Sequence, residues 1–154
     1  MKMNGEVKQK INDALSHLIW ETSSKCVFLV DINGNLISAA GYTGDIDTVD
    51  LASLSASHFA ATAALARMMN DNKFTVLFHK GKKESIDINK VGSKYLLVTV
   101  FGEKTVLGVL QKETKKTIDS LESILKEYSK VEEKPIKDVK NTLSQEIDSL
   151  LKDM

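Results

Sequence analysis

Three short apolar runs near the middle of the chain limit the fold more than any other feature. The runs are KFTVLFH, ESIDIN and KYLLVTVF, within residues 73–101, and Gly81 and Gly92 lie in the short connections between them. β-Branched and aromatic residues favour strands, and Ile86 and Ile88 alternate with polar neighbours. Parallel strands need a crossover of a dozen or more residues, and these connections leave no room for one. The pattern therefore predicts an antiparallel meander.

Two further strands are predicted, one on each side of Asn33-Gly34. The runs KCVFLVDI and NLISAAG flank this dipeptide, which is a strong signal for a two-residue hairpin turn. The same stretch is similar to the start of a calcium loop, because Asp31, Asn33 and Asn35 occupy alternate positions. An EF-hand loop counted from Asp31 needs glycine at its sixth position and glutamate at its twelfth, but leucine and tyrosine stand there. We therefore expect a hairpin and no metal site.

Apolar residues spaced by three and four predict one helix before these strands and another after them. We expect the buried stripe of the first helix to comprise Val7, Ile11, Ala14, Leu15, Leu18 and Thr22. Trp20 lies off that stripe. The other helix follows the meander in KTVLGVLQKETKKTIDSLESILKEY, and its expected inward residues are Leu107, Leu110, Thr114, Thr117, Leu121, Ile124 and Leu125.

A long helix between the two groups of strands is rich in small residues. It lies in TVDLASLSASHFAATAALARMMND, where Asp47 or Thr48 is the expected N-cap and Asp50 adds favourable charge to the first turn. We expect its inward stripe to be Leu51, Leu54, His58, Leu65 and Met68. Alanine and serine occupy most other positions, which suits either a close fit on the chain's own sheet or a second contact with another helix. The residues alone leave both interpretations open.

The only proline, Pro135, lies in the charged stretch SKVEEKPIKD and predicts the end of the compact domain. We expect a domain over residues 1–127, a charged linker over 128–135 and an amphipathic helix over 136–154. The apolar stripe of that last helix comprises Ile136, Val139, Leu143, Ile147, Leu150 and Leu151. Such a helix needs a surface to lie against, which is its own domain, a partner protein or another copy of the chain.

Composition and charge argue against several classes of protein. Acidic and basic residues balance at 21 each, so nothing predicts binding to nucleic acid or to an anionic membrane. The single cysteine, Cys26, excludes an internal disulfide framework and fits a reducing compartment. The sequence shows neither a secretory signal nor a run of about 20 apolar residues that would span a bilayer. We expect a cytoplasmic protein.

The residues also predict no catalytic or metal centre. No phosphate-binding G-x-x-x-x-G-K-[ST] motif occurs, and His17, His58 and His79 lack metal-ligand spacing with one another or with Cys26. Cys26 opens a buried strand, where we expect it to be inert. Acidic residues such as Asp87 suit turns and caps. We therefore expect no enzyme activity and no cofactor.

The order helix, hairpin, long helix, three strands and helix resembles the roadblock/LC7 family over residues 5–127. Three motifs carry the resemblance: VDINGNLISAAG as the glycine hairpin, DTVDLASLSASHFAATAALARMM as the small-residue helix, and EKTVLGVLQKE, where Gly108 is expected to let the last domain helix lie close to the sheet. Within the family, the chain most resembles the bacterial MglB-type proteins. The resemblance implies an α+β, profilin-like fold with a five-stranded antiparallel sheet and helices on its faces.

The same resemblance implies a homodimer that binds a Ras-like small GTPase of the MglA type and regulates its nucleotide cycle. The sheets are expected to join at an edge formed by Phe74, Val76 and Phe78, and the central helices to pair. The expected contact surface comprises Ser53, Ser57, Ala60, Ala61, Ala64 and Arg67. Arg67 is the only arginine of the chain. Because a helix C-terminus favours arginine in any case, we expect GTPase activation without an arginine finger.

Two other functions stay open at this point. Roadblock domains also serve as non-catalytic scaffolds in larger signalling, motility or polarity complexes, without altering GTP turnover. A small-ligand sensor of the profilin-like type would need a pocket with convergent polar groups, and the sequence announces none. The nucleotide preference of GTPase binding would separate a regulator from a scaffold.

Overall fold

The computed structural model describes residues 4–152, and for residues 130–144 and 146 it describes only the course of the backbone. The fold is α+β, with one five-stranded antiparallel sheet in the strand order β2-β1-β5-β4-β3. In chain order, the elements are α1 (Gly5–Thr22), β1 (Cys26–Asp31), β2 (Leu36–Gly41), α2 (Thr48–Met68), β3 (Val76–Lys80), β4 (Ser85–Val91), β5 (Tyr95–Phe101) and α3 (Leu107–Lys152). The predicted hairpin and the predicted three-strand meander are both confirmed.

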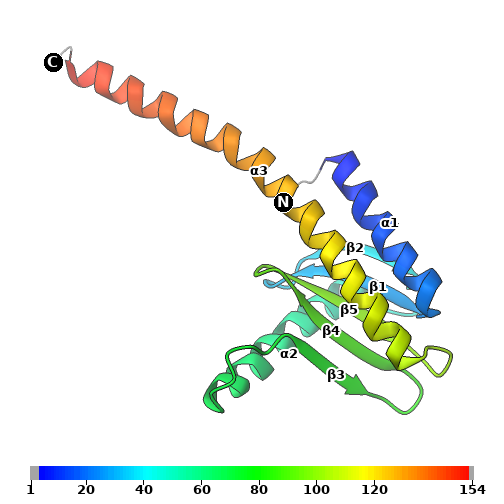
Figure 1. Ribbon diagram of the computed structural model, residues 1–154. Helices are drawn as coiled ribbons and strands as arrows, with labels where there is room; N and C mark the ends of the chain where they lie inside the picture. Colours follow the sequence, from blue (N-terminus) through cyan, green and yellow to red (C-terminus); the bar gives the residue numbers. More distant parts are fainter. Residues whose placement is uncertain (1–3, 153–154) are drawn as a thin grey trace.

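Helices cover both faces of the sheet, with α1 and α3 side by side on one face and α2 on the other (Figure 1). The interior strand β1 contributes to both cores, because successive side chains point to opposite faces. Val27 and Leu29 pack with α1 and α3, whereas Phe28 and Val30 pack with α2. All four side chains are fully buried. The run KCVFLVDI is therefore a strand covered on both faces, as its composition predicted.

The β1–β2 hairpin turns through a three-residue loop rather than the predicted two-residue turn. The amide of Gly34 donates to the carbonyl oxygen of Asp31, and the amide of Asp31 donates to the carbonyl oxygen of Asn35. Within this loop only Gly34 has a positive φ, of 92°, which is typical of a type I turn followed by a glycine bulge. The Asp31 carboxylate accepts the backbone amides of Asn33 and Asn35 and so closes the turn. In the described part of the chain, no group of three or more His, Cys, Asp or Glu side chains is placed to hold a metal ion.

The side of α2 that packs on the sheet is not the side that the apolar spacing predicted. Leu54, Leu65 and Met68, expected to face inward, are 68%, 61% and 81% exposed, and His58 is exposed as well. The buried residues of the helix are Ala52, Ser55, Ala56 and Phe59. Small side chains let a helix approach a sheet closely, and Leu54, Leu65 and Met68 are left on the outside.

α3 is a single helix that runs through the predicted linker at residues 128–135. Pro135 removes one backbone donor from its interior, and the helix nevertheless continues to Lys152. Among the side chains of α3 that the structure describes, Tyr128 is the last buried one, and beyond that residue the helix leaves the body of the protein (Figure 1). The predicted separate C-terminal helix is therefore the distal part of α3.

The apolar stripe predicted for this distal part is described only in places. Ile147 and Leu150 are 56% and 68% exposed. Ile136, Val139 and Leu143 lie outside the residues whose side chains are described. What the stripe contacts stays a prediction.

Two expectations for the first turn of α3 were wrong. Leu107 is 46% exposed rather than buried. Gly108 does not lie against the sheet, because a methyl group added at its Cα would meet no atom within 4 Å. The rest of the predicted inward stripe is buried or partly buried, with Leu110, Thr114, Thr117, Leu121 and Leu125 among the buried residues. No helix in the described range 4–152 has the length and apolar character needed to cross a membrane.

Candidate partner-binding and dimer surfaces

The outward side of α2 brings together the six residues predicted to contact a partner. All six are exposed in the structure: Ser53, Ser57, Ala60, Ala61, Ala64 and Arg67. Residues three or four apart share one face of a helix, so these side chains form a continuous strip. The exposed Leu54, Leu65 and Met68 border that strip. We call these residues together the α2 face, a surface whose contiguous apolar character is typical of a protein–protein contact.

The α2 face lies on a helix with well-defined ends. The Asp47 carboxylate accepts the backbone amide of Asp50 at 3.0 Å and caps the N-terminus, as predicted. Past the other end, Asn70 adopts a φ of 62°, a left-handed conformation that ends helices. Arg67 lies in the last turn, where the helix dipole favours positive charge. A partner would therefore meet a rigid surface.

β3 is an edge of the sheet, as the sequence predicted. It pairs with β4 on one side, so its other side presents backbone donors and acceptors outward. Val76 and Phe78 are 50% and 44% exposed on this strand. Phe74 precedes the strand, and its ring centroid lies 5.1 Å from that of Phe59 on α2. The structure thus places Val76 and Phe78 at the edge and Phe74 in the packing between the edge segment and α2.

A groove of about 610 Å³ lies between α3 and the edge of the sheet formed by β3 and β4. Its apolar lining includes Val76, Phe78, Leu107 and Ile118, and its polar lining includes Asp87, Asn89 and Thr114. We call this feature the α3 groove. It was missed in the sequence, where Asp87 was assigned to a turn or cap. Asp87 instead lies within β4 and is 6% exposed.

One signal in the sequence pointed to this groove. In ESIDIN, Asp87 and Asn89 alternate with Ile86 and Ile88, so the polar pair occupies one face of the strand. The isoleucines pack towards α2. The opposite face would ordinarily be solvated in an antiparallel sheet, but here α3 covers it (Figure 1).

The carboxylate of Asp87 is buried with a hydrogen bond from a neutral group. Nδ2 of Asn89 donates to Oδ2 of Asp87 at 2.8 Å. Burial raises the pKa of Asp87 above its ordinary value, and the hydrogen bond from Asn89 lowers that pKa by a smaller amount. The hydroxyls of Thr99, directly opposite Asp87 on β5, and of Thr114 are buried without a hydrogen-bond partner among the described residues. Such groups are costly to bury unless something supplies the missing hydrogen bonds.

Lys25 connects three segments at the surface. Its Nζ lies 2.9 Å from Oδ2 of Asp45 and 3.0 Å from Oε1 of Glu84, and 5.8 Å from the centre of the Tyr42 ring. These hydrogen bonds raise the pKa of Lys25 and lower the pKa of Asp45. They join the start of β1 to the loop before α2 and to the β3–β4 hairpin. Burial raises the pKa of the neighbouring Cys26 thiol to about 11, so the thiol stays protonated and unreactive, as predicted.

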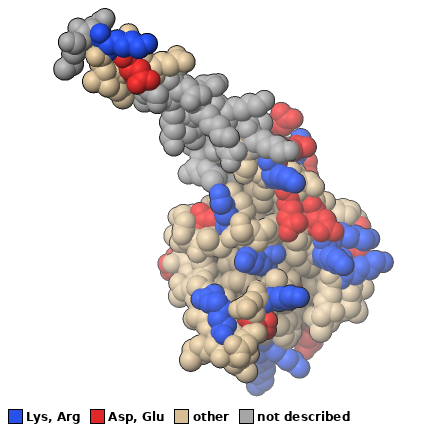
Figure 2. Space-filling model, turned by 60° about the vertical axis from the view of Figure 1, so that its left-hand side comes forward, with Lys and Arg blue, Asp and Glu red and all other residues tan. Residues whose placement is uncertain are grey.

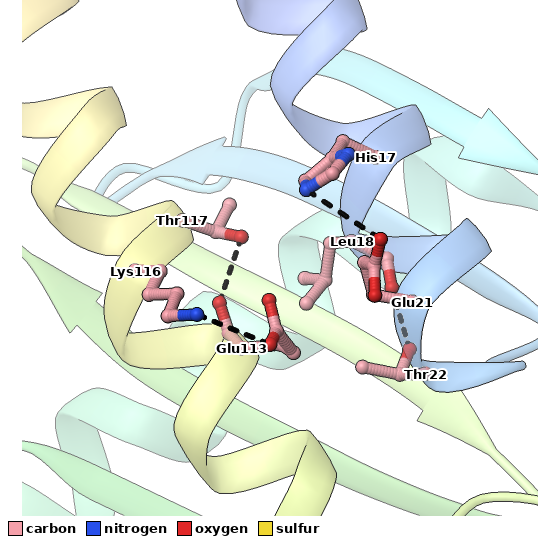
Figure 3. A network of polar contacts seen from close by, with 7 residues as sticks. All are labelled: His17, Leu18, Glu21, Thr22, Glu113, Lys116 and Thr117. Carbon is pink, nitrogen blue, oxygen red and sulfur yellow. Dashed lines mark hydrogen bonds and ion pairs between the residues drawn. The ribbon is translucent and has the colours of Figure 1, made fainter.

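The polar contacts drawn in Figure 3 each stay within one helix, either α1 or α3. Nε2 of His17 lies 4.0 Å from Oε1 of Glu21 on the same helix. The two neighbouring hydroxyls donate to backbone carbonyls, Thr22 to Leu18 at 2.7 Å and Thr117 to Glu113 at 2.9 Å. Neither hydroxyl is therefore held as a nucleophile against an imidazole base.

Charge over the visible surface is mixed rather than of one sign. Figure 2 shows Lys and Arg side chains interspersed with Asp and Glu side chains on the face that it displays. This distribution agrees with the formal net charge of zero. It differs from the single-sign field that steers nucleic acid or anionic membranes to a protein.

Comparisons with known proteins agree with this architecture. A family model described as the roadblock/LC7 domain matches residues 22–101. The structure of Myxococcus xanthus MglB is similar with a TM-score of 0.78 and 41% sequence identity, over 83% of this chain and 96% of that chain. The gliding protein MglB from Thermus thermophilus is similar with a TM-score of 0.76 and 26% identity, over 81% of this chain and 95% of that chain.

A more distant structure shares the fold alone. Profilin II from Acanthamoeba castellanii has a TM-score of 0.51 and 16% identity, over 72% of this chain and 93% of that chain. No curated protein sequence matches the chain. The roadblock/LC7 model spans more than half of the chain, from the end of α1 through β5. The five-stranded sheet, the helices on its two faces and this match agree, and the chain belongs to the roadblock/LC7 family.

Proposed function

We propose that this protein is a homodimeric regulator of a Ras-like small GTPase of the MglA type. One observation carries the proposal: α2 turns Leu54, Leu65 and Met68 away from its own sheet and into solvent. Burial of such a side chain is worth about 1.5–3 kcal/mol, so a helix that leaves them exposed together is suited to a partner. The similarity to MglB structures, including one described as having a tetrameric arrangement, supports self-association and a GTPase partner.

Two surfaces serve the proposed dimer. The edge strand β3 pairs with β3 of a second copy and extends the sheet, which removes an exposed edge. The α2 helices of the two copies lie together on one face of the joined sheet. A two-fold interface uses the same patch twice, and a stable one buries about 1,600 Å² in total. The paired α2 faces then form one platform on which a single GTPase binds.

The proposed regulator acts on GTP hydrolysis without contributing a catalytic side chain. Arg67, the only arginine, is exposed at the end of α2 and is explained by its favourable place in the helix dipole. A surface that binds the productive arrangement of the GTPase switch segments more tightly than other arrangements raises the population of that arrangement. Activation then follows from differential binding.

Bulky substitutions on the α2 face test the platform. Ala60→Arg and Ala64→Arg should each lower GTPase binding at least tenfold, because the added side chains overfill a surface that small residues make approachable. Ser16→Arg on α1 is the matched control, an exposed small residue outside the α2 face, and it should bind like the unmodified chain. Isothermal titration with the GTPase measures the affinities. Normal binding by both alanine variants would place the platform elsewhere.

Removal of the only arginine tests the catalytic part of the proposal. Arg67→Ala should retain stimulation of GTP hydrolysis within a few-fold, whereas loss of an arginine finger lowers the rate by about 10³ or more. Single-turnover hydrolysis at saturating regulator is the measurement, and Lys73→Ala is the control for loss of one nearby positive charge. A collapse of the rate with unchanged binding would show that Arg67 acts in catalysis.

Nucleotide preference separates the proposed regulator from a scaffold. A protein that promotes hydrolysis by stabilising the active switch arrangement should bind the GTP-loaded form of the GTPase more tightly than the GDP-loaded form. A pull-down with the GTP-loaded and the GDP-loaded GTPase measures the ratio of the amounts bound. Equal binding together with an unchanged hydrolysis rate would leave the chain as a scaffold.

A further inference from the structure

The α3 groove contains a buried acidic group, Asp87, for which the described side chains provide no cation. Asp87 is 6% exposed, and the groove beside it measures about 610 Å³. Lys90 and Lys115 also line the groove. Among the residues whose side chains the structure describes, neither lysine forms an ion pair with Asp87. The unpartnered Thr114 hydroxyl lies in the same lining.

The groove opens at the edge of the sheet, on the face that carries α3. In the β3–β4 pair, Val76 lies opposite Asn89 and Phe78 lies opposite Asp87. Directly paired residues of antiparallel strands point to the same face. Side chains alternate along a strand, so Lys80 shares this face with Val76 and Phe78. Lys80 is exposed.

The symmetry of an extended sheet decides which residues of a second copy reach this face. A two-fold axis perpendicular to the sheet keeps each face on its own side. Even-numbered residues of β3 must therefore pair with even-numbered residues of the other β3, whatever the register. Lys80 of the second copy then always lies on the face that carries Asp87.

We propose that Lys80 of a second copy completes the α3 groove and places its ammonium group against Asp87 across the dimer edge. This inference rests on the proposed function, because it needs β3 to pair with β3. Neighbouring strands lie about 4.8 Å apart, so Asp87 on β4 is about 10 Å from the backbone of the second β3. The four-carbon stem of lysine spans most of that distance. The joined sheet carries two such ion pairs, one from each copy.

The second copy is the occupant that the groove favours over a free small molecule. The groove is open to the edge strand, and its apolar rim, Val76 and Phe78, consists of the same exposed residues that pairing of β3 would cover. The acidic group and the basic group are complementary in charge and belong to one chain. In the proposed dimer, Lys80 of each copy therefore provides the cation for Asp87 of the other copy.

Self-association of single variants is the first measurement. Asp87→Asn and Lys80→Gln should each weaken the homodimer, because each variant dimer loses both ion pairs. At about tenfold for each lost pair, the low end for close charge pairs across interfaces, the loss is about a hundredfold in the dimer dissociation constant. Lys82→Gln, in the exposed turn after β3, is the matched control and should leave it unchanged. Sedimentation equilibrium measures the dimer dissociation constant of the unmodified protein and of the three variants.

A mixture of the two variants tests whether the contact runs between copies. In the mixed dimer, Asp87 of the Lys80→Gln chain meets Lys80 of the Asp87→Asn chain, so one complete pair returns. The mixed dimer should therefore be about tenfold tighter than either variant homodimer. If Lys80 and Asp87 were in contact within one chain, the mixed dimer would be no tighter than the variant homodimers. Differently tagged chains and quantitative exchange measure the mixed species.

A second measurement does not depend on the Asp87→Asn variant and therefore holds even if that variant misfolds. The carboxyl ¹³C resonance of Asp87, titrated in the otherwise unmodified protein and in Lys80→Gln, should show a higher apparent pKa once the ammonium group is lost. Unchanged titration, or a mixed dimer no tighter than the homodimers, overturns the ion pair. If none of these variants changes the dimer dissociation constant, the ion pair is contradicted but the proposed regulator is not. If the unmodified chain is a monomer, both proposals are contradicted.

Discussion

Gly41 ends β2 at a point where the chain has no room for a side chain. Its φ is +90°, and a Cβ atom there would lie 2.4 Å from the carbonyl oxygen of Lys25 and 2.9 Å from Cα of Cys26. Both contacts are with backbone, which cannot move aside as a flexible side chain can. The small-residue ending of NLISAAG therefore has a physical cause, namely the close approach of β2 to the start of β1.

Gly41→Ala should lower the free energy of unfolding by about 1–3 kcal/mol from backbone strain alone. Gly108→Ala is the control, because a Cβ at that position would meet no atom within 4 Å. That change lies on a helix, where alanine is favoured by up to about 1 kcal/mol. Chemical denaturation of both variants gives the comparison. Equal stability of the two would contradict the close contact at Gly41.

At the scale of elements, α2 is the helix whose sides differ most from expectation. Its buried side consists of Ala52, Ser55, Ala56 and Phe59, whereas Leu65 and Met68 face solvent. In a single copy, the side chains of Leu65 and Met68 stay in water. The arrangement suits a helix between its own sheet and a second helix, which was one of the two interpretations of its composition.

Leu65→Glu should dissociate the proposed dimer without unfolding the domain, since Leu65 is 61% exposed and makes no part of the buried core. A charge placed in an apolar interface is costly to desolvate, so the dimer dissociation constant should rise at least a hundredfold. Trp20→Glu, at a residue 84% exposed on α1, is the control. Light scattering and circular dichroism report mass and folding. Dissociation by Trp20→Glu with an intact dimer in Leu65→Glu would move the interface to α1.

At the scale of the whole molecule, α3 has two parts with different roles. The part up to Tyr128 packs on the sheet and α1, with Leu121 fully buried in the core. The part beyond it extends from the body (Figure 1), and Ile147 and Leu150 on it are exposed. The described side chains of the distal part therefore add nothing to the buried core.

Ending the chain after residue 129 should leave the domain folded, with a melting temperature within a few degrees of the full chain. The reason is that Tyr128 is the last buried residue of α3 among those whose side chains are described. Leu121→Ala in the full chain is the contrasting variant and should cost about 2–5 kcal/mol of stability. Thermal unfolding measures both. Unfolding of the shortened chain would show that the distal part supports the core.

Much of this fold follows from local patterns of residues. Asn33-Gly34 between apolar runs predicted the β1–β2 hairpin, and the short connections at Gly81 and Gly92 predicted the antiparallel order of β3, β4 and β5. These features depend on turn chemistry and on alternation along a strand, which neighbouring residues specify by themselves.

Other features depend on what covers each surface, which spacing along a chain does not report. Apolar residues lie on more than one side of α2, so only packing decided that Ala56 faces the sheet and Leu65 faces solvent. The alternating pattern of ESIDIN predicts that Asp87 faces solvent, but in the structure α3 packs next to that face of the strand. That the helix continues through Pro135 is likewise seen only in the backbone of the structure. Periodicity reports the polarity of a face, and burial follows from the partner that the fold places against it.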